Sequence, residues 1–536
     1  MSSLPFLCIA PDVPTSYPYQ KVRIVLCVVL AICVSLFVVG TIHWPLVNDP
    51  SQIDYVCFMM DHGMSPYKDM IEMNMPGIYL VNWTVMHTLG GGPFAWRAFD
   101  FALMGAAALA MIAIAWPYDW FGGVFGASLF ILFHGRDGPA QAGQRDLVIA
   151  VLLVCAYAFL FHALRKGKAW PMFFFGMCAA AAATIKPTPL PFALLLLAIA
   201  AFRLKRLGKP MVPPVVLAFA GMCVPLTVVG IFLAQKHALG EFIYVMRKVL
   251  PYYAHLGRHN FAYLLDNSMT SSIVTLIIIA LAIAAFDRSW KNWETITLLL
   301  GVAFGVLSYF AQGKGFPYHR YPMLAFIMLC VGLMFTSALR KPGMVRALGM
   351  AGLAFGVIVA PLYAQRAHRR YWDEAFIYAL SGDLSQLGGI RLSGHVQCIY
   401  MPADCDTALY RMQLVQSTGL FYDYFIFGPS QHPVIEEYRS RFWRELQGNP
   451  PRVIVIGQGL YPDDLDDYRK LNQWPQFETY LYANYVLYDE RAFKPSDPGP
   501  RGFRVYVQKN ESQLDGNKSE LSASLDKARM MHESGN

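Results

Sequence analysis

Long apolar runs separated by short polar connections fill the chain between residues 22 and 365. A helix that spans a bilayer needs about 20 mostly apolar residues. Eleven runs are therefore predicted to span a membrane: 24–43, 96–116, 121–133, 147–164, 170–185, 189–202, 212–233, 272–286, 293–310, 324–339 and 349–363. The apolar stretch 77–91 is short for a span, and we expect a helix that lies at the outer membrane surface.

The orientation follows from lysine and arginine, which are enriched in short cytoplasmic loops. With residues 1–21 in the cytoplasm, every basic cluster between spans falls inside, including those after residues 164, 202 and 339. The same topology puts five connecting segments on the outer face: 44–91, 135–146, 186–188, 236–270 and 312–321.

The composition changes from about residue 365 onward, where short β-rich runs alternate with helical patterns. Strands are predicted at 396–401, 422–427, 452–456, 485–488 and 503–507, with helices at 434–447 and 464–480. This alternation predicts a small α/β domain over 366–510, followed by a disordered polar tail over 511–536. Cys398 and Cys405 could form a disulfide if this part is extracytoplasmic, and the sequence leaves that pairing open.

Composition agrees with a membrane location. Hydrophobic residues make up 55% of the 536 residues and charged residues 15%, whereas soluble domains come closer to a quarter charged. The formal net charge of +8 does not indicate nucleic acid, because most of the excess lies in short loops where it sets topology. The predicted fold class is an α-helical polytopic membrane protein with an extracytoplasmic α/β domain.

Carboxylates gather directly after the first span, in the segment 44–76. Acids beside a membrane helix are expensive to hold near lipid, so they are candidates for function. Asp49 is nearest the span and is the first choice for a general base, with Asp54 second; a solvated loop charge is the alternative. Asp146 opens a later span and could orient an acceptor or a metal ion, or simply favour the helix N-terminus.

Seven cations in the outer loops run against the topology rule: Arg136, Arg145, Lys186, Arg247, Lys248, Lys314 and Arg320. Such cations suggest a bound anion, and phosphate is the natural one; side chains that snorkel to the interface are the alternative. His319, between Tyr318 and Arg320, could bind phosphate or a metal, or be structural. Tyr252 could stack on a sugar or belong to the interfacial aromatic belt.

The ordered segments VNDPSQIDYVCFMMDHGMSPYKDMIEMNMPGIYL, FAWRAFD, GQRDLVIAVLL, ATIKPTP and QGKGFPYHRYP resemble the GT-C superfamily of polyprenyl-phosphate-dependent glycosyltransferases. The chain is most similar to the bacterial branch related to protein O-mannosyltransferases and the lipid A aminoarabinose transferase. The resemblance covers roughly residues 20–365 and, more loosely, the C-terminal part. It implies a multi-pass protein of the bacterial inner membrane, with a transmembrane catalytic domain over 22–365 and a periplasmic C-terminal domain.

The resemblance also assigns roles. Setting Gly63, Pro66 and Tyr67 on the family's Gly-x-x-Pro-Tyr places Asp49 on its catalytic aspartate. The acid that follows this aspartate in the family is Pro50 here, which leaves the use of a divalent cation open.

Three further residues match family positions. Arg97 matches an arginine that opens the second span, Asp146 the acid of the second outer loop, and Lys186 a lysine associated with the lipid phosphate. The candidate substrate-binding residues are thus Arg97, Arg145, Lys186, Arg247, Tyr252, Lys314, Tyr318, His319 and Arg320.

The function implied is transfer of a sugar from a polyprenyl-phosphate donor to an extracytoplasmic glycan, lipid or protein, with inversion. Two other classes stay open: a lipid-linked sugar flippase or transporter, and a non-catalytic membrane subunit. A transporter would tend to carry inverted repeats, and no repeat is evident in the sequence.

Overall fold

The computed structural model describes residues 17–288, 291–400, 404–462, 468–493 and 502–509. It divides into two compact units, each built from separate stretches of chain. We call them the helical unit (Met1–Leu46, Thr88–Val229 and His259–Tyr371) and the mixed unit (Val47–His87, Gly230–Arg258 and Trp372–Asn536). Most of the first outer loop therefore groups with the C-terminal part, although the sequence had assigned it to the transmembrane domain. The predicted domain boundaries stay a prediction.

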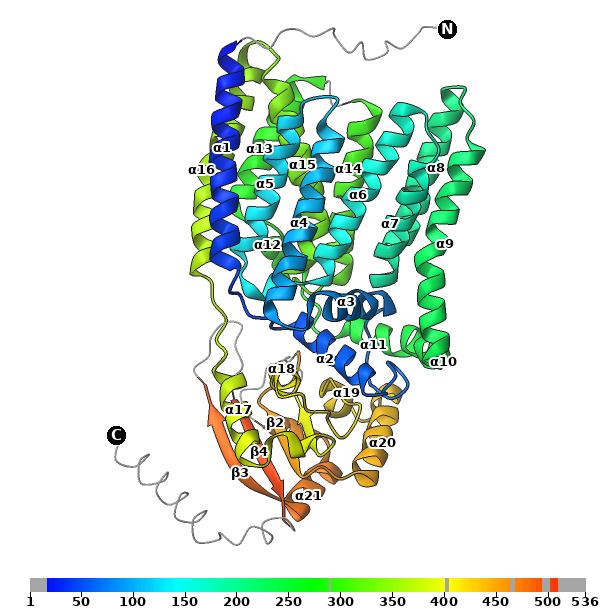
Figure 1. Cartoon of the computed structure of the whole chain (residues 1–536), viewed down its shortest axis with the longest axis vertical. Helices are drawn as coiled ribbons and strands as arrows, with labels where there is room; N and C mark the ends of the chain where they lie inside the picture. The colour runs from blue at the N-terminus through cyan, green and yellow to red at the C-terminus, as the bar shows by residue number, and fades with distance from the viewer. Residues whose placement is uncertain (1–16, 289–290, 401–403, 463–467, 494–501, 510–536) are drawn as a thin grey trace, which may run out of the picture. The chain divides into compact units, whose positions relative to one another are not determined.

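The helical unit is a bundle of long helices (Figure 1). Each of the eleven predicted spans coincides with one of them: α1 (Tyr17–Thr41), α4 (Pro93–Ala115), α5 (Trp120–Arg136), α6 (Arg145–Lys166), α7 (Pro171–Ile185), α8 (Pro189–Arg206), α9 (Val212–Gln235), α13 (Ser271–Phe286), α14 (Trp293–Gln312), α15 (Tyr321–Ala338) and α16 (Gly343–Arg369). Short helices join them: η1 (Pro139–Gln141), α12 (Phe261–Ser268) and η4 (Pro317–Arg320).

Length and composition support fewer spans than eleven. Among the described helices, seven are long and apolar enough to cross a membrane, or eight if α12 and α13, which meet at 83°, form one bent span. The difference arises in part because α5 has 17 residues and α7 has 15, below the ~20 that an upright span needs. The chain is thus a multi-span membrane protein, and the count of eleven stays a prediction.

Local sequence fixes where these helices begin and end. The side chain of Asp119 accepts a hydrogen bond from Phe121 N at the start of α5, and Asn292 does the same for Thr295 N at the start of α14. Helix α14 ends at Gly313, whose φ of 68° lies in the left-handed region that favours glycine.

Ion pairs join the helices at one end of the bundle, which we call the basic end. Arg165, in the last turn of α6, reaches Glu294 at the start of α14 at 2.5 Å. Arg23 of α1 lies 2.6 Å from Asp119, which also lies 3.5 Å from Arg340 after α15. An unpaired ion among membrane helices is costly, so these pairs stabilise the bundle where its basic residues gather.

The mixed unit is built on a four-stranded sheet of order β1-β2-β4-β3 (Figure 1). Two fully buried strands, the edge strand β1 (Val396–Ile399) and its neighbour β2 (Val453–Gly457), are parallel, whereas β4 (Gly502–Gln508) runs antiparallel to both β2 and β3 (Tyr485–Ala492). Its helices are α2 (Asp49–Asp61), α3 (Pro76–Leu89), α10 (Leu239–Tyr244), η2 (Val245–Val249), α11 (Leu250–His255), α17 (Ala375–Gln386), η5 (Gly389–Leu392), α18 (Asp404–Arg411), α19 (Tyr424–Phe427), α20 (Pro433–Gly448), η6 (Arg469–Gln473) and α21 (Pro475–Asn484).

Two predicted elements of this unit are wrong. The predicted strand 422–427 contains helix α19 instead, because its aromatic residues, which favour strands, are all buried as core side chains. The predicted helix 464–480 is divided between η6 and α21, since Pro475 begins a new helix as its first residue. The tail 511–536 and residues 464–467 lie outside the described residues.

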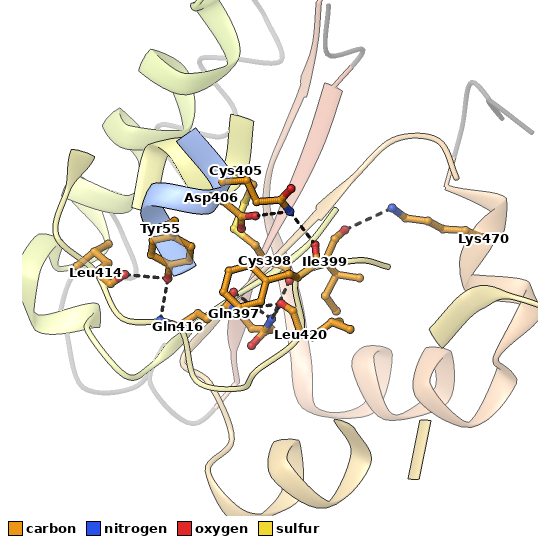
Figure 2. The surroundings of a disulfide bond; sticks show 12 residues. Tyr55, Gln397, Cys398, Ile399, Cys405, Asp406, Leu414, Gln416, Leu420 and Lys470 are labelled. Carbon is orange, nitrogen blue, oxygen red and sulfur yellow. Dashed lines mark hydrogen bonds between the residues drawn. A yellow bond between two sulfur atoms is a disulfide. The ribbon is translucent and has the colours of Figure 1, made fainter. Parts of the chain in front are cut away.

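A disulfide joins Cys398, in strand β1, to Cys405, near the start of α18 (Figure 2). The sequence left this pairing open, and the structure forms it. Structural disulfides persist in oxidising compartments such as the bacterial periplasm.

We expect Asp404→Asn to stabilise the chain more at pH 8 than at pH 5. Burial raises the pKa of Asp404 from 3.8 to about 7. Between about pH 4 and pH 7 the folded state therefore binds this proton more tightly than the unfolded state does, so its contribution to stability falls as the pH rises. Asparagine removes the charge but keeps the oxygen that accepts from Trp372 Nε1, 3.3 Å away.

The test is the apparent melting temperature in detergent, followed by tryptophan fluorescence from pH 5 to pH 8. The gap between the variant and the wild type should widen by a few degrees toward pH 8. Glu436→Gln, which neutralises an exposed acid on α20, is the matched control and should show no such widening. If the melting temperatures of Asp404→Asn and the wild type changed in parallel with pH, the raised pKa of Asp404 would be contradicted.

Candidate active site

Four basic side chains from three helix ends come together at the end of the helical unit opposite the basic end. Arg145 opens α6, Lys186 follows α7, and Lys314 and His319 come from the turn between α14 and α15. The positive charges of Lys186, Arg145 and Lys314 all act on the His319 ring. We call these four residues the cation cluster. The structure therefore brings together residues that the sequence spreads over some 175 positions.

Lys186 is held firmly within this cluster. Its Nζ donates to both carboxylate oxygens of Asp146, at 2.7 and 2.8 Å, and to Gln312 Oε1 at 2.7 Å. Asp146 is 2% exposed, so a buried carboxylate partly neutralises this ammonium. Three acceptor oxygens thus lie within hydrogen-bond distance of this ammonium. Lys186 thus supplies charge to the site, and a hydrogen bond to a ligand would require it to release Gln312 or Asp146.

His319 is the residue in this cluster whose surroundings call for a further group. Its side chain is buried, and its Nδ1 has no hydrogen-bond partner among the described residues. The Tyr318 ring packs edge-on against it, with the ring centroids 4.7 Å apart. A buried polar atom left without a partner costs about 1–3 kcal/mol. A nitrogen in this condition beside three cations suits an anionic ligand.

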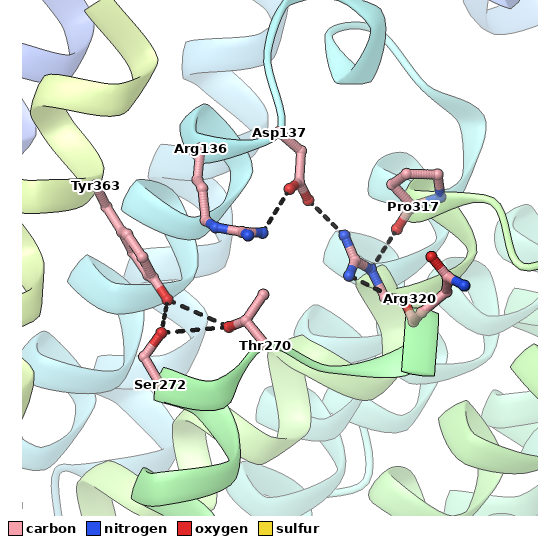
Figure 3. Close-up of polar contacts among 8 residues, drawn as sticks. Arg136, Asp137, Thr270, Ser272, Pro317, Arg320 and Tyr363 are labelled. Carbon is pink, nitrogen blue, oxygen red and sulfur yellow. Dashed lines mark hydrogen bonds and ion pairs between the residues drawn. The ribbon is translucent and has the colours of Figure 1, made fainter. Parts of the chain in front are cut away.

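Arg320, which the sequence groups with these cations, has protein partners instead (Figure 3). Its Nη2 lies 2.6 Å from Asp137 Oδ2, its Nε donates to Pro317 O at 3.0 Å, and its Nη1 donates to Asn267 O at 3.2 Å. Asp137 also accepts from Arg136 Nη1 at 2.8 Å. Because the guanidinium is taken up by these contacts, Arg320 is suited to hold the turn that carries His319.

A buried network that the sequence did not reveal lies nearby in the same unit. Asp100 Oδ2 lies 3.0 Å from Arg97 Nη1 and 3.2 Å from His134 Nε2, while its Oδ1 accepts from Gly143 N at 3.0 Å. His134 Nδ1 lies 2.6 Å from Tyr321 OH. Arg97 is thus paired with a carboxylate, and Asp100 holds the loop that leads into Arg145. The one sequence signal was a carboxylate inside an apolar run.

Asp49 belongs to the mixed unit, where it is the first residue of α2. It is half-buried, and in the described part of the chain it has no hydrogen-bond or ion-pair partner. The preceding residue, Asn48, has φ 61° and ψ −150°, a conformation that is strained for any residue other than glycine. Strain of this kind costs about 1–3 kcal/mol and tends to occur at functional sites.

Asp54, the second choice for a base, is fully buried. Its Oδ1 accepts from Asn82 Nδ2 at 2.9 Å, which connects α2 to α3. This placement favours a structural role, because a base must reach its substrate.

The adjoining face of α2 binds the segment around α18. Ser51 Oγ lies 2.7 Å from Thr407 Oγ1, and Gln52 Nε2 donates to Asp406 Oδ2 at 3.1 Å.

Tyr55 continues this attachment one turn further along α2 (Figure 2). Its hydroxyl donates to Leu414 O at 2.9 Å and accepts from Gln416 N at 3.0 Å. The first outer loop and the C-terminal part therefore form one hydrogen-bonded body, which explains their grouping in the mixed unit.

The remaining two candidates also belong to the mixed unit. Arg247 is exposed on η2, and the Tyr252 ring packs 4.4 Å from that of His432. Tyr252 is thus used at least in part for internal packing. Within the described part of the chain, no three His, Cys, Asp or Glu side chains are grouped so as to hold a metal ion.

The class that the fold defines is a multi-span membrane protein with the GT-C fold. The chain is similar to ArnT from Cupriavidus metallidurans in the apo state, with a TM-score of 0.53 over 91% of this chain and 98% of that one, at 12% identity. ArnT bound to undecaprenyl phosphate matches over the same shares at 12% identity, with a TM-score of 0.50. An oligosaccharyltransferase of Archaeoglobus fulgidus matches with a TM-score of 0.48 over 83% of this chain and 70% of that chain, at 10% identity.

No family model matches the sequence, and no curated protein matches it. At 12% identity the likeness to ArnT establishes the fold alone.

We expect Asp146→Asn to destabilise the helical unit by about 3 kcal/mol, because breaking a partly buried ion pair leaves Lys186 without its counter-charge. The double variant Asp146→Asn with Lys186→Met should recover most of that loss, since it removes both charges. Unfolding by denaturant in detergent micelles gives the three free energies. A double variant no more stable than Asp146→Asn would show that the pair does not hold α6 and α7 together.

Proposed function

We propose that this chain is a membrane glycosyltransferase that moves a sugar from a polyprenyl-phosphate donor to an acceptor outside the membrane, with inversion at the anomeric carbon. The observation that carries the proposal is the cation cluster with its partnerless His319 nitrogen, at one end of a bundle with the GT-C fold. A solved structure of ArnT, which has this fold, contains bound undecaprenyl phosphate, which supports a lipid phosphate as the anion.

The cation cluster would act on the leaving group. When the bond between sugar and phosphate breaks, negative charge grows on the polyprenyl phosphate. Arg145, Lys186 and Lys314 bring three positive charges to bear on His319, and Asp146 is paired with Lys186. Fixed charges in a water-poor site stabilise such a transition state without reorganising. In this proposal Asp146 orients Lys186, and Arg320 positions the turn without touching the phosphate.

Asp49 would act as the general base that takes the proton from the acceptor hydroxyl. Its lack of a protein partner and the strain at Asn48 support this choice over Asp54. Four further candidate substrate-binding residues have weaker support: Arg97, Arg247, Tyr252 and Tyr318. Whether the reaction uses a divalent cation is left open.

The proposed location is a bacterial inner membrane. The N-terminus would lie in the cytoplasm and the mixed unit in the periplasm. The disulfide between Cys398 and Cys405 supports an oxidising compartment for the mixed unit. The basic residues gathered at the basic end support a cytoplasmic side for that end of the helical unit. The acceptor is a glycan, a lipid or a protein, and the sugar is a hexose or a pentose.

Asp49→Asn should lower the rate of transfer by about a hundredfold to ten-thousandfold while donor binding is largely kept, because the amide cannot accept the proton. The assay is transfer by purified protein in detergent from a panel of short-chain polyprenyl-phosphate sugars. Asp61→Asn, which changes an exposed acid in the last turn of the same helix, is the control and should keep most activity. Full activity in Asp49→Asn would contradict the assignment of Asp49 as the general base.

His319→Phe should weaken binding of the donor about tenfold without lowering stability. Phenylalanine has a similar shape but lacks the buried nitrogen that has no protein partner. The folded protein therefore loses no hydrogen bond, whereas the ligand loses one. His395→Phe, the same change at an exposed histidine of the mixed unit, serves as the control and should leave donor affinity unchanged. Unchanged donor affinity in His319→Phe, measured by isothermal titration, would remove His319 from the site.

A further inference from the structure

A groove of about 770 Å³ opens between α4 and α6 at the basic end of the helical unit. Apolar side chains of these two helices form its floor. Trp116, Trp170, His162 and Lys166 stand at its polar edge. The two helices are both candidate membrane spans, so the groove faces lipid along its length.

The edge of the groove is positively charged. Lys166 lines it and is exposed, and Lys168 follows two residues later, also exposed. Lys209 lies close by, since a Cβ atom built on Gly167 would be 3.1 Å from its Nζ. Arg165 also lines the groove, but it forms an ion pair with Glu294. No acidic side chain is among the described residues that line the groove.

Two tryptophans mark the depth of this site in the membrane. Trp116 and Trp170 are 68% and 51% exposed, and exposed tryptophans of membrane proteins gather at the interface between lipid and water. Helix α6 runs from Arg145 in the cation cluster to Lys166 at the groove. Its 22 residues at 1.5 Å each give about 33 Å, which is close to the thickness of a hydrocarbon core. The groove and the cation cluster therefore lie at opposite membrane interfaces.

We propose that this groove is a binding site for an anionic phospholipid of the leaflet at the basic end. An acyl chain lies along the apolar floor between α4 and α6, and the phosphate lies beside Lys166, within reach of Lys168. Basic pockets between membrane helices on the cytoplasmic side bind anionic head groups in this way. The site is separate from the proposed glycosyl transfer, and it stands whether or not that proposal does.

The charge of the lipid is tested by native mass spectrometry of the purified chain, titrated with phosphatidylglycerol and with phosphatidylcholine of the same acyl chains. The wild type should bind phosphatidylglycerol more tightly. Lys166→Gln with Lys168→Gln should weaken that binding by about fivefold per charge removed, or roughly 25-fold together, and leave phosphatidylcholine unaffected. The matched control is Lys21→Gln with Lys205→Gln, two exposed cations of the same end that do not line the groove.

The groove itself is tested by Ala113→Phe, which fills the floor without changing charge. This variant should lose the high-affinity site for both lipids. Equal binding of the two lipids by the wild type would overturn the proposal. Phosphatidylglycerol binding that the lysine variant leaves unchanged, or that the control pair weakens as much, would also overturn it, because the cations would then act only through general surface charge.

Discussion

The cation cluster is arranged around the ion pair between Lys186 and Asp146. An ammonium near lipid needs a counter-charge, and Asp146 supplies it from another helix at 2.7 Å. The pair fixes the end of α7 against the start of α6, and Gln312 adds the end of α14. The next turn of the chain carries Lys314 and His319. One partly buried pair thus links the three helix ends that carry the cation cluster.

In the mixed unit, hydrogen bonds from uncharged side chains of α2 join distant parts of the chain, as the ion pair does in the helical unit. Helix α2 is attached through Ser51, Gln52 and Tyr55 to the segment around α18, and the disulfide ties α18 to strand β1. Asp49 therefore stands at the first residue of a helix whose other contacts reach into a folded sheet domain. A C-terminal domain bound in this way gives the first outer loop a rigid support, which a loop of this length would lack by itself. Support of that kind agrees with the role of general base proposed for Asp49, which requires a fixed position.

Much of this fold could be predicted from the sequence, because apolar runs, capping residues such as Asp119 and Asn292, and buried strands are local patterns. The site could be predicted only in part. Lys186 and Lys314 stood out as cations in outer loops, and His319 as a possible phosphate or metal ligand. Nothing local indicated that Asp100 would meet His134, 34 positions away, or that Asp137 would meet Arg320, 183 positions away. Such pairs arise from helix packing. The prediction of a strand at 422–427 was wrong. Its aromatic residues favour strands locally, but in the structure they are buried in the core from the short helix α19.

Charge alone does not identify a ligand-binding residue, and the adjacent residues His319 and Arg320 illustrate why. Both are basic, both are buried, and the sequence treats them alike. Arg320 uses its Nε and both terminal nitrogens on Asp137, Pro317 and Asn267, so a ligand would have to displace existing bonds. His319 keeps a buried nitrogen that no described residue satisfies. A buried polar atom without a partner is costly, so its presence calls for an explanation, and a bound ligand or an ordered water would each supply a partner. The unsatisfied nitrogen, more than the sum of positive charge, is therefore the reason to propose His319 as a ligand-binding residue.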